Sequence, residues 1–143
     1  MAGSYRRPRH IEGIDVAPSL VVDDEESNRT FAAQVLSEAN YEVVSASDGP
    51  EVLRIVEEQS PFDLFVVDVL MPQMQGDELA RRLRQMDPDA KILYLTAYSD
   101  RLFEHRHALW ANEAFVEKPV SMDGLLEAVS LILFGHTQRG RSS

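Results

Sequence analysis

Short apolar runs alternate with longer amphipathic stretches between about residue 18 and residue 134. The runs are rich in β-branched side chains, which is typical of strands buried on both faces of a parallel sheet. The most continuous run, Leu64–Val69, is expected to form the central strand. The pattern predicts five strands, at Leu20–Val22, Tyr41–Ala46, Leu64–Val69, Ile92–Thr96 and Ala114–Val116.

Five helices are expected after these strands, because apolar side chains recur there every three or four residues. Pro50 is compatible with the first turn of the second helix, and Asp87-Pro88 ends the third. Ser121 is expected to cap the last helix. The predicted helices cover approximately residues 27–39, 48–59, 77–86, 100–111 and 121–134.

The sequence also predicts the caps and the buried side chains of three of the helices. Ser27 or Asn28 is expected to cap the first helix, and Asn40 to end it with a positive φ angle, which Asn tolerates. The side chains expected to face the sheet are Phe31, Val35, Leu36 and Ala39 of the first helix, Leu79 and Leu83 of the third, and Leu125, Leu126, Val129, Leu133 and Phe134 of the last.

The alternation of strands and helices with short connections predicts an α/β fold. In such a fold the strands are parallel, the crossovers are right-handed and helices cover both faces of the sheet. The 143 residues are enough for one domain with a real core and too few to expect two. We expect residues 1–17 to be a flexible N-terminal arm, residues 18–134 the folded domain and residues 135–143 a flexible C-terminal tail.

The composition excludes several classes of protein. Residues 16–134 hold 22 acidic and 9 basic side chains, a net charge of −13, so direct binding of nucleic acid is not expected. No apolar stretch approaches the ~20 residues of a membrane-spanning helix, and the N-terminal residues lack the apolar segment of a secretory signal. The absence of cysteine excludes disulfides and Cys-based metal sites. We expect a cytoplasmic protein with no membrane partner.

Polar residues stand where the predicted strands end, at Asp23, Asp24, Asp68, Thr96 and Lys118. The carboxyl ends of parallel strands lie at one edge of the sheet, where ligands bind. Three carboxylates in a small volume repel one another unless a cation lies between them, and oxygen ligands with room for water suit Mg²⁺. Asp23 and Asp24 alone would be interpreted as a solvated turn, but Asp68 and Lys118 favour a metal site.

The same set of residues favours phosphoryl transfer. It contains no histidine and no serine, so a Ser-His-Asp triad has no candidate base here. A carboxylate can attack phosphorus and form an acyl phosphate, while Mg²⁺ shields the developing charge. An ammonium and a hydroxyl can each contact one of the remaining phosphoryl oxygens.

Four motifs occur in order at the ends of the predicted strands. They are Val22-Asp23-Asp24-Glu25, Asp68-Val69-Leu70-Met71-Pro72 with Gly76, Leu95-Thr96-Ala97, and Lys118-Pro119. Together they resemble the receiver domain of bacterial two-component response regulators, over a stretch from about Leu20 to Leu133. The resemblance implies a flavodoxin-like, doubly wound sheet of five parallel strands in the order 2-1-3-4-5, with five helices.

The resemblance also implies roles for individual residues. Asp68 would be the phosphoacceptor, and Thr96 and Lys118 would bind phosphoryl oxygens. Thr96 and Phe115 would form a conformational switch, although Phe115 is equally compatible with plain core packing. The peptide bond from Lys118 to Pro119 would be cis. The groups implied to hold Mg²⁺ are the side chains of Asp23 (through water), Asp24 and Asp68 and the main-chain carbonyl of Leu70.

Some positions depart from the pattern of the family. Asn40 and Asn112 replace common glycines at helix ends, and Gln75 stands where many members carry Asp. Leu70 and Tyr98 occupy positions that, in the family, tune access of the hydrolytic water. Both are bulky and neither is an acid or an amide, so we predict a long-lived phosphoryl group.

The sequence is therefore interpreted as a signalling switch of a two-component system. It would accept a phosphoryl group on Asp68 from a sensor histidine kinase or a phosphotransfer protein, and control a partner or an output domain. It would catalyse only its own phosphorylation and dephosphorylation. One alternative is an aspartyl-phosphate phosphotransferase or phosphohydrolase, which needs a second acid where this chain has Leu70. The other is a degenerate receiver that acts only as an interaction module.

The predicted fourth helix contains more large apolar side chains than one face can bury. It is either a well-buried helix or part of a surface, formed with the fifth strand and the fifth helix, through which the family commonly dimerises or meets partners. His105 and His107 do not share a helix face, so a chelating pair is disfavoured. The large apolar side chains are Leu102, Phe103, Leu109 and Trp110. Whether the chain acts alone or within a longer protein is left open.

Overall fold

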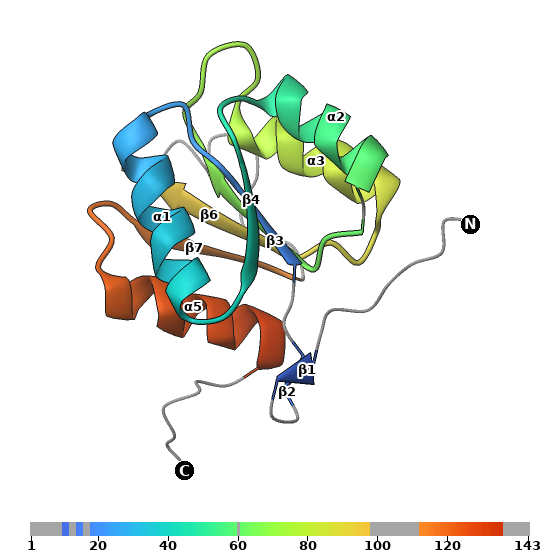
Figure 1. Cartoon of the computed structure of the whole chain (residues 1–143). Coiled ribbons are helices and arrows are strands. Elements are labelled where there is room, and N and C mark those ends of the chain that lie inside the picture. The colour runs from blue at the N-terminus through green and yellow to red at the C-terminus, as the bar shows by residue number, and fades with distance from the viewer. Residues whose placement is uncertain (1–9, 12–13, 16–17, 60, 98–111, 136–143) are drawn as a thin grey trace.

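A computed structural model describes residues 10–11, 14–15, 18–59, 61–97 and 112–135. Its main feature is a five-stranded sheet with helices on both faces (Figure 1). The strands are β3 (Pro18–Val22), β4 (Glu42–Ala46), β5 (Leu64–Asp68), β6 (Ile92–Thr96) and β7 (Glu113–Glu117). The helices within the described residues are α1 (Glu26–Glu38), α2 (Gly49–Gln59), α3 (Gly76–Met86) and α5 (Met122–Phe134).

The sheet has the strand order β4-β3-β5-β6-β7, and all neighbouring strands are parallel. Numbered along the chain from β3, this is the predicted order 2-1-3-4-5, which is confirmed. Strand β5 is buried at every position and lies at the centre, as the continuous apolar run indicated. The ends of most strands differ from the predicted ends by one or two residues, because backbone pairing rather than side-chain polarity decides where a strand ends.

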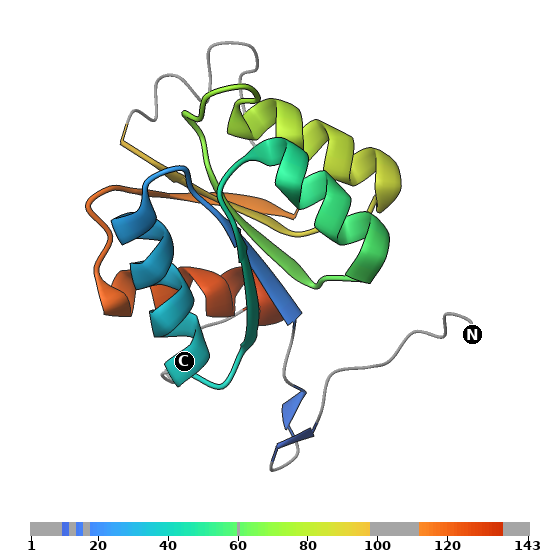
Figure 2. The same cartoon turned by 45° about the horizontal axis from the view of Figure 1, so that its top comes forward.

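The two faces of the sheet bury separate hydrophobic cores. Helices α2 and α3 lie side by side over one face, and α1 and α5 cover the other, as Figures 1 and 2 show from two directions. Side chains alternate between the faces along each strand. On β3, Leu20 and Val22 belong to the core under α2 and α3, whereas Val21 belongs to the core under α1 and α5.

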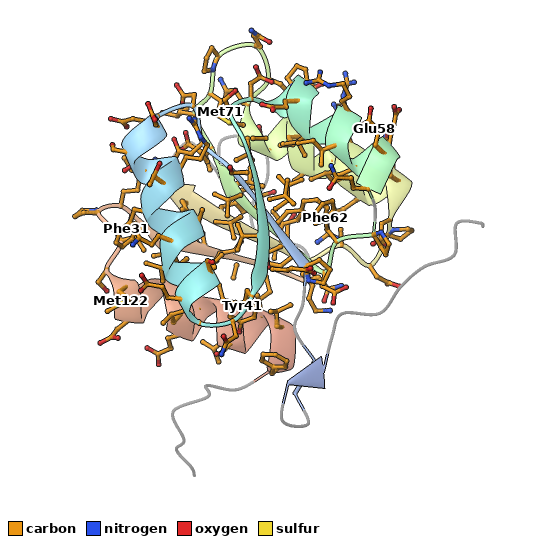
Figure 3. The ribbon with its side chains drawn as sticks, in the orientation of Figure 1. Phe31, Tyr41, Glu58, Phe62, Met71 and Met122 are labelled. Atoms are coloured by element: carbon orange, nitrogen blue, oxygen red, sulfur yellow. The ribbon has the colours of Figure 1, made fainter. Side chains whose placement is uncertain are left out.

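Helix α1 differs from its prediction in two respects. It begins at Glu26 after Glu25, so neither Ser27 nor Asn28 is its N-cap. The Asn28 amide instead donates a hydrogen bond of 2.8 Å to the Glu25 carboxylate. Phe31, expected to face the sheet, is 39% exposed (Figure 3). It misses the core because the buried stripe consists of Ala32, Val35 and Leu36, which leaves Phe31 beside the stripe rather than in it.

Other local predictions were more successful. The positive φ angle predicted for Asn40 is confirmed, at 75°. Asn112, which also stands where glycine is common, has a φ angle of 68°. Ser121 caps α5 by accepting a hydrogen bond of 2.9 Å from the amide of Gly124. Four of the side chains expected to face the sheet are buried: Leu79 and Leu83 of α3, and Leu125 and Val129 of α5. Two others on α5 are half-buried, Leu126 and Leu133. Phe134 is 37% exposed, because it is the last residue of the helix.

Two short segments precede the sheet. Strands β1 (His10–Ile11) and β2 (Ile14–Asp15) pair antiparallel within the stretch expected to be a loose arm. The predicted helix at 100–111, with its apolar side chains and both histidines, lies outside the described residues, as does Tyr98. Among the described helices, none is long and apolar enough to cross a membrane.

Candidate functional site

Three acidic residues meet at the carboxyl edge of the sheet. Asp23 and Asp24 follow β3 directly, and Asp68 is the last residue of the neighbouring strand β5. One carboxylate oxygen from each of the three lies within 4.8 Å of the other two. Adjacent parallel strands end at the same edge, so the fold produces this convergence from residues 44 or more positions apart in the chain.

Lys118 brings the positive charge predicted for this edge. Its ammonium lies 3.1 Å from Oδ1 of Asp68 and 3.2 Å from Oδ2 of Asp23. The main-chain amide of Lys118 donates to the carbonyl of Thr96 at 2.8 Å, which extends the pairing of β6 and β7 by one residue. The peptide bond to Pro119 is cis, as expected.

Burial divides the acidic residues into two kinds. Asp23 and Asp68 are only 1% and 5% exposed, whereas Asp24 is exposed to solvent. Thr96 is also buried, at the end of β6 beside β5. Leu70 is half-buried and packs against the core under α2 and α3. The edge therefore offers two enclosed carboxylates and one that faces water.

The pKa values of the site residues reflect this enclosure. Burial, and then repulsion by Asp23, raise the pKa of Asp68 to about 7, although Lys118 acts in the opposite direction. Burial lowers the pKa of Lys118, but the attraction of Asp68 and Asp23 outweighs it, so that pKa is raised overall and the amine stays charged. One ammonium does not neutralise three carboxylates. A hard divalent cation such as Mg²⁺ fits the oxygen donors and the unbalanced negative charge.

A pH dependence of stability follows from Asp68. Its pKa is about 7 in the folded protein against an ordinary 3.8, so the folded state binds this proton more tightly than the unfolded state. Without metal, the free energy of unfolding should therefore fall as the pH rises from about 4 to about 7, by roughly 1 kcal/mol per pH unit from this residue.

Urea denaturation in a chelator at several pH values checks this prediction. The relevant quantity is the difference in the free energy of unfolding between the wild type and Asp68→Asn. The other carboxylates contribute equally to the pH dependence of both proteins, so their contributions cancel in this difference. We expect that difference to fall with pH, and saturating Mg²⁺ to reverse the fall. A difference that does not change between pH 5 and pH 8 would contradict the assignment.

Contacts that the sequence did not predict also hold the site. The main-chain amide of Glu25 donates to Oδ1 of Asp23 at 2.9 Å, and a guanidinium nitrogen of Arg29 donates to the Asp23 carbonyl at 2.8 Å. No sequence signal pointed to Arg29, because an arginine in the second turn of an amphipathic helix is normally interpreted as a solvated side chain. Phe115 lies on β7 beside Tyr94 and is 36% exposed.

Comparison with known proteins identifies the family. The sequence matches the family model of the response regulator receiver domain over residues 19–130. The chain belongs to the response regulator receiver family. Receiver domains are signalling modules of two-component systems that are phosphorylated on an aspartate, and the predicted family and fold are both confirmed.

Individual relatives show the same relationship. The chain is 35% identical over 118 residues to the sensor kinase CckA of Brucella abortus, covering 82% of this chain and 12% of CckA. It is 37% identical over 114 residues to the alkaline phosphatase synthesis transcriptional regulatory protein PhoP of Bacillus subtilis, covering 80% of this chain and 47% of PhoP. The receiver domain described here thus spans less than half of the length of either of these curated relatives.

Solved structures agree. The crystal structure of the response regulator TrrA from Thermotoga maritima, in complex with Mg²⁺ and BeF, matches with a TM-score of 0.73 and 36% sequence identity. The match covers 82% of this chain and 100% of TrrA. The chemotaxis protein CheY4 of Vibrio cholerae matches with a TM-score of 0.71 and 30% identity, over 82% of this chain and 99% of CheY4.

Proposed function

We propose that this receiver domain is a Mg²⁺-dependent switch that is phosphorylated on Asp68. The observation that carries the proposal is the position of Asp68 within the acidic cluster. Asp68 is the last residue of the central strand, it is only 5% exposed, and its Oδ1 lies 3.1 Å from the Lys118 ammonium. The other buried member of the cluster, Asp23, also contacts Lys118, but it follows β3 and its two carboxylate oxygens already accept from Glu25 and Lys118. A nucleophile in the position of Asp68 lies beside a cationic group, the Lys118 ammonium, which can stabilise the negative charge of an incoming phosphoryl group.

The residues that would hold the metal are those nearest the acceptor. Asp24 and Asp68 would be direct ligands with the main-chain carbonyl of Leu70, and Asp23 would act through water. Mg²⁺, when bound, supplies positive charge that shields the carboxylates from one another and from the phosphoryl oxygens. Asp23 is better placed to position than to ligate, because its two oxygens already accept from Glu25 and Lys118.

The chemical step is an in-line displacement at phosphorus. An oxygen of the Asp68 carboxylate forms a bond to phosphorus while the bond from phosphorus to the donor breaks, and the donor leaves with the electron pair. The product is an acyl phosphate. Lys118 would exchange its contact with the Asp68 carboxylate for one with a phosphoryl oxygen, and the Thr96 hydroxyl would bind another. Hydrolysis of the acyl phosphate regenerates the carboxylate.

Signal output would follow from the change at Thr96. Movement of Thr96 toward the phosphoryl group would open space on β6, and Phe115 on the neighbouring strand β7 would turn inward to fill it. In the structure Phe115 is 36% exposed, which would correspond to the conformer in which Phe115 has not yet turned inward. The phosphoryl group acts by shifting the populations of two conformers.

Partners are proposed from the family and its relatives. Receiver domains of this kind interact with histidine kinases or phosphotransfer proteins, and two relatives of this chain are themselves sensor kinases. We propose the same phosphodonor for this domain, in the cytoplasm. The proposed surface for dimerisation or partner docking consists of β7 and α5, where Phe115, Leu131 and Phe134 are exposed, together with the helix predicted from the sequence at 100–111, which lies outside the described residues.

Mass measurement tests the function directly. The protein is incubated with acetyl phosphate, with and without Mg²⁺, and its intact mass is recorded. We expect a gain of one phosphoryl group that requires Mg²⁺. No gain under either condition would contradict a working site. An enzyme with aspartyl-phosphate chemistry is not favoured, because Leu70 stands where such an enzyme carries its second acid.

The lifetime of the phosphoryl group gives a further prediction. Leu70 is an apolar, half-buried side chain two residues after Asp68. We propose that it hinders the approach of the water that would hydrolyse the acyl phosphate. We expect slow loss of the phosphoryl group in Mg²⁺ buffer, and a lifetime several-fold shorter in Leu70→Asn, whose amide can orient a water. Leu70→Met, which keeps the volume and polarity, is the control. Equal lifetimes in all three proteins would show that Leu70 does not govern hydrolysis.

A further inference from the structure

Arg29 makes a contact with the acidic cluster that its position on α1 would not indicate. Its guanidinium reaches back past the start of the helix, and Nη1 donates a hydrogen bond of 2.8 Å to the main-chain carbonyl of Asp23. The contact is partly buried, so it competes less with water than an exposed one would. The carbonyl that Arg29 holds belongs to the peptide group between Asp23 and Asp24.

Asp23, which supplies the carbonyl of that peptide group, makes four hydrogen-bonding contacts. The Asp23 amide donates to the Ala46 carbonyl at 3.3 Å, which attaches the end of β3 to β4. Its carboxylate accepts from the Glu25 amide at 2.9 Å and from the Lys118 ammonium at 3.2 Å. The carbonyl contact with Arg29 completes the set. Arg29 is the only one of these partners that acts on the carbonyl, and thus on the orientation of the peptide leading to Asp24.

We propose that Arg29 is a positioning residue for the metal site, and the inference rests on the proposed function. Asp24 is exposed and lies outside the regular pairing of β3, so the peptide before it sets the direction of its carboxylate. The negative charge of Asp23, and that of Asp68 when it is ionised, would repel that carboxylate toward solvent. By holding the peptide, Arg29 keeps the Asp24 carboxylate in the cluster, ready for a divalent cation.

The chemistry of arginine suits this task. A guanidinium is charged at every pH at which the protein is folded, and it donates in a fixed planar geometry. The hydrogen bond of Arg29 is to a main-chain carbonyl and not to the carboxylate of the phosphoacceptor Asp68, so the proposed role of Arg29 is to position a metal ligand rather than to react.

Calorimetric titration of the unphosphorylated protein with Mg²⁺ tests the proposal. We expect Arg29→Met to bind Mg²⁺ about tenfold more weakly than the wild type, the usual cost of removing a group that orients a metal ligand. Arg29→Lys should recover most of the affinity, because an ammonium on a long stem can still donate to the carbonyl. The matched control is Arg54→Met, which removes the same charge from an exposed position on α2.

The outcomes separate this inference from the proposed function. A wild type that does not bind Mg²⁺ would overturn both. A wild type that binds, with Arg29→Met no weaker than Arg54→Met, would overturn only the role of Arg29. Thermal unfolding in a chelator shows whether each variant is folded. If Arg29→Met does not fold, Arg29→Gln, whose amide is too short to reach back, takes its place, and affinity equal to the control would again overturn the role.

Discussion

Asp68→Asn should be folded and should gain no phosphoryl group from acetyl phosphate and Mg²⁺. The substitution keeps the shape of the side chain but replaces the nucleophilic carboxylate with an amide, which does not form an acyl phosphate. Folding should survive because the buried carboxyl of Asp68 is costly to ionise, as its raised pKa of about 7 shows. Above that pH the variant should be more stable than the metal-free wild type.

Intact mass over time checks the prediction, together with circular dichroism to confirm the fold. Asp89→Asn is the matched control, since Asp89 is an exposed aspartate that follows α3, outside the acidic cluster. It should gain the phosphoryl group at the wild-type rate. If Asp68→Asn were phosphorylated as the wild type is, the acceptor would be another residue, and peptide mapping would be directed first at Asp23 and Asp24.

Gly76→Ala should lower the free energy of unfolding by about 3 kcal/mol or more. Gly76 begins α3 and donates to the carbonyl of Val69 at 2.8 Å, which brings the helix close to the end of β5. A Cβ atom there would clash with the main-chain oxygen of Asp68, and would lie 2.9 Å from Cγ1 of Val67 and from Cα of Val69. Two of these atoms are backbone and cannot yield without moving the acceptor strand.

Urea denaturation of Gly76→Ala measures the loss. Gly124→Ala is the control, because the added Cβ in α5 would meet only the Ser121 hydroxyl oxygen at 3.0 Å, and the helix gains propensity from alanine. We expect its stability to change by less than about 1 kcal/mol. Equal stabilities of the two variants would mean that α3 can shift away from β5 at little cost. The close packing would then not be what fixes the carbonyl of Asp68.

The pattern of apolar residues predicted the sheet well for a physical reason. The central strand of a parallel sheet that is covered on both faces has no solvent side, so the burial of β5 is visible in the sequence as the unbroken apolar run Leu64–Val67 before Asp68. The polar residues that end such runs are then conspicuous. Asp23, Asp68 and Thr96 were found because each interrupts apolar sequence at an edge where ligands bind.

Helix faces were predicted less reliably than strands. Phe31 was placed in the core from its spacing, but smaller neighbours on α1 fill the space against the sheet and leave it exposed. The N-cap of α1 was assigned to Ser27 or Asn28 by residue preference, whereas the chain leaves β3 through Glu25 and begins its first turn earlier. Both errors arise because packing against the sheet, rather than local propensity, sets the start and the rotation of a helix.

The sequence by itself determined the order of the elements, the residues at the strand ends and therefore the acidic chemistry of the site. Only the tertiary structure decided how those residues are held: that Lys118 bridges Asp23 and Asp68, that burial raises the pKa of Asp68, and that Arg29 reaches the Asp23 carbonyl. The division has a physical cause. An apolar run and the polar residue that follows it can be recognised from local sequence, whereas distances, desolvation and long side-chain contacts depend on segments that meet only when the chain has folded.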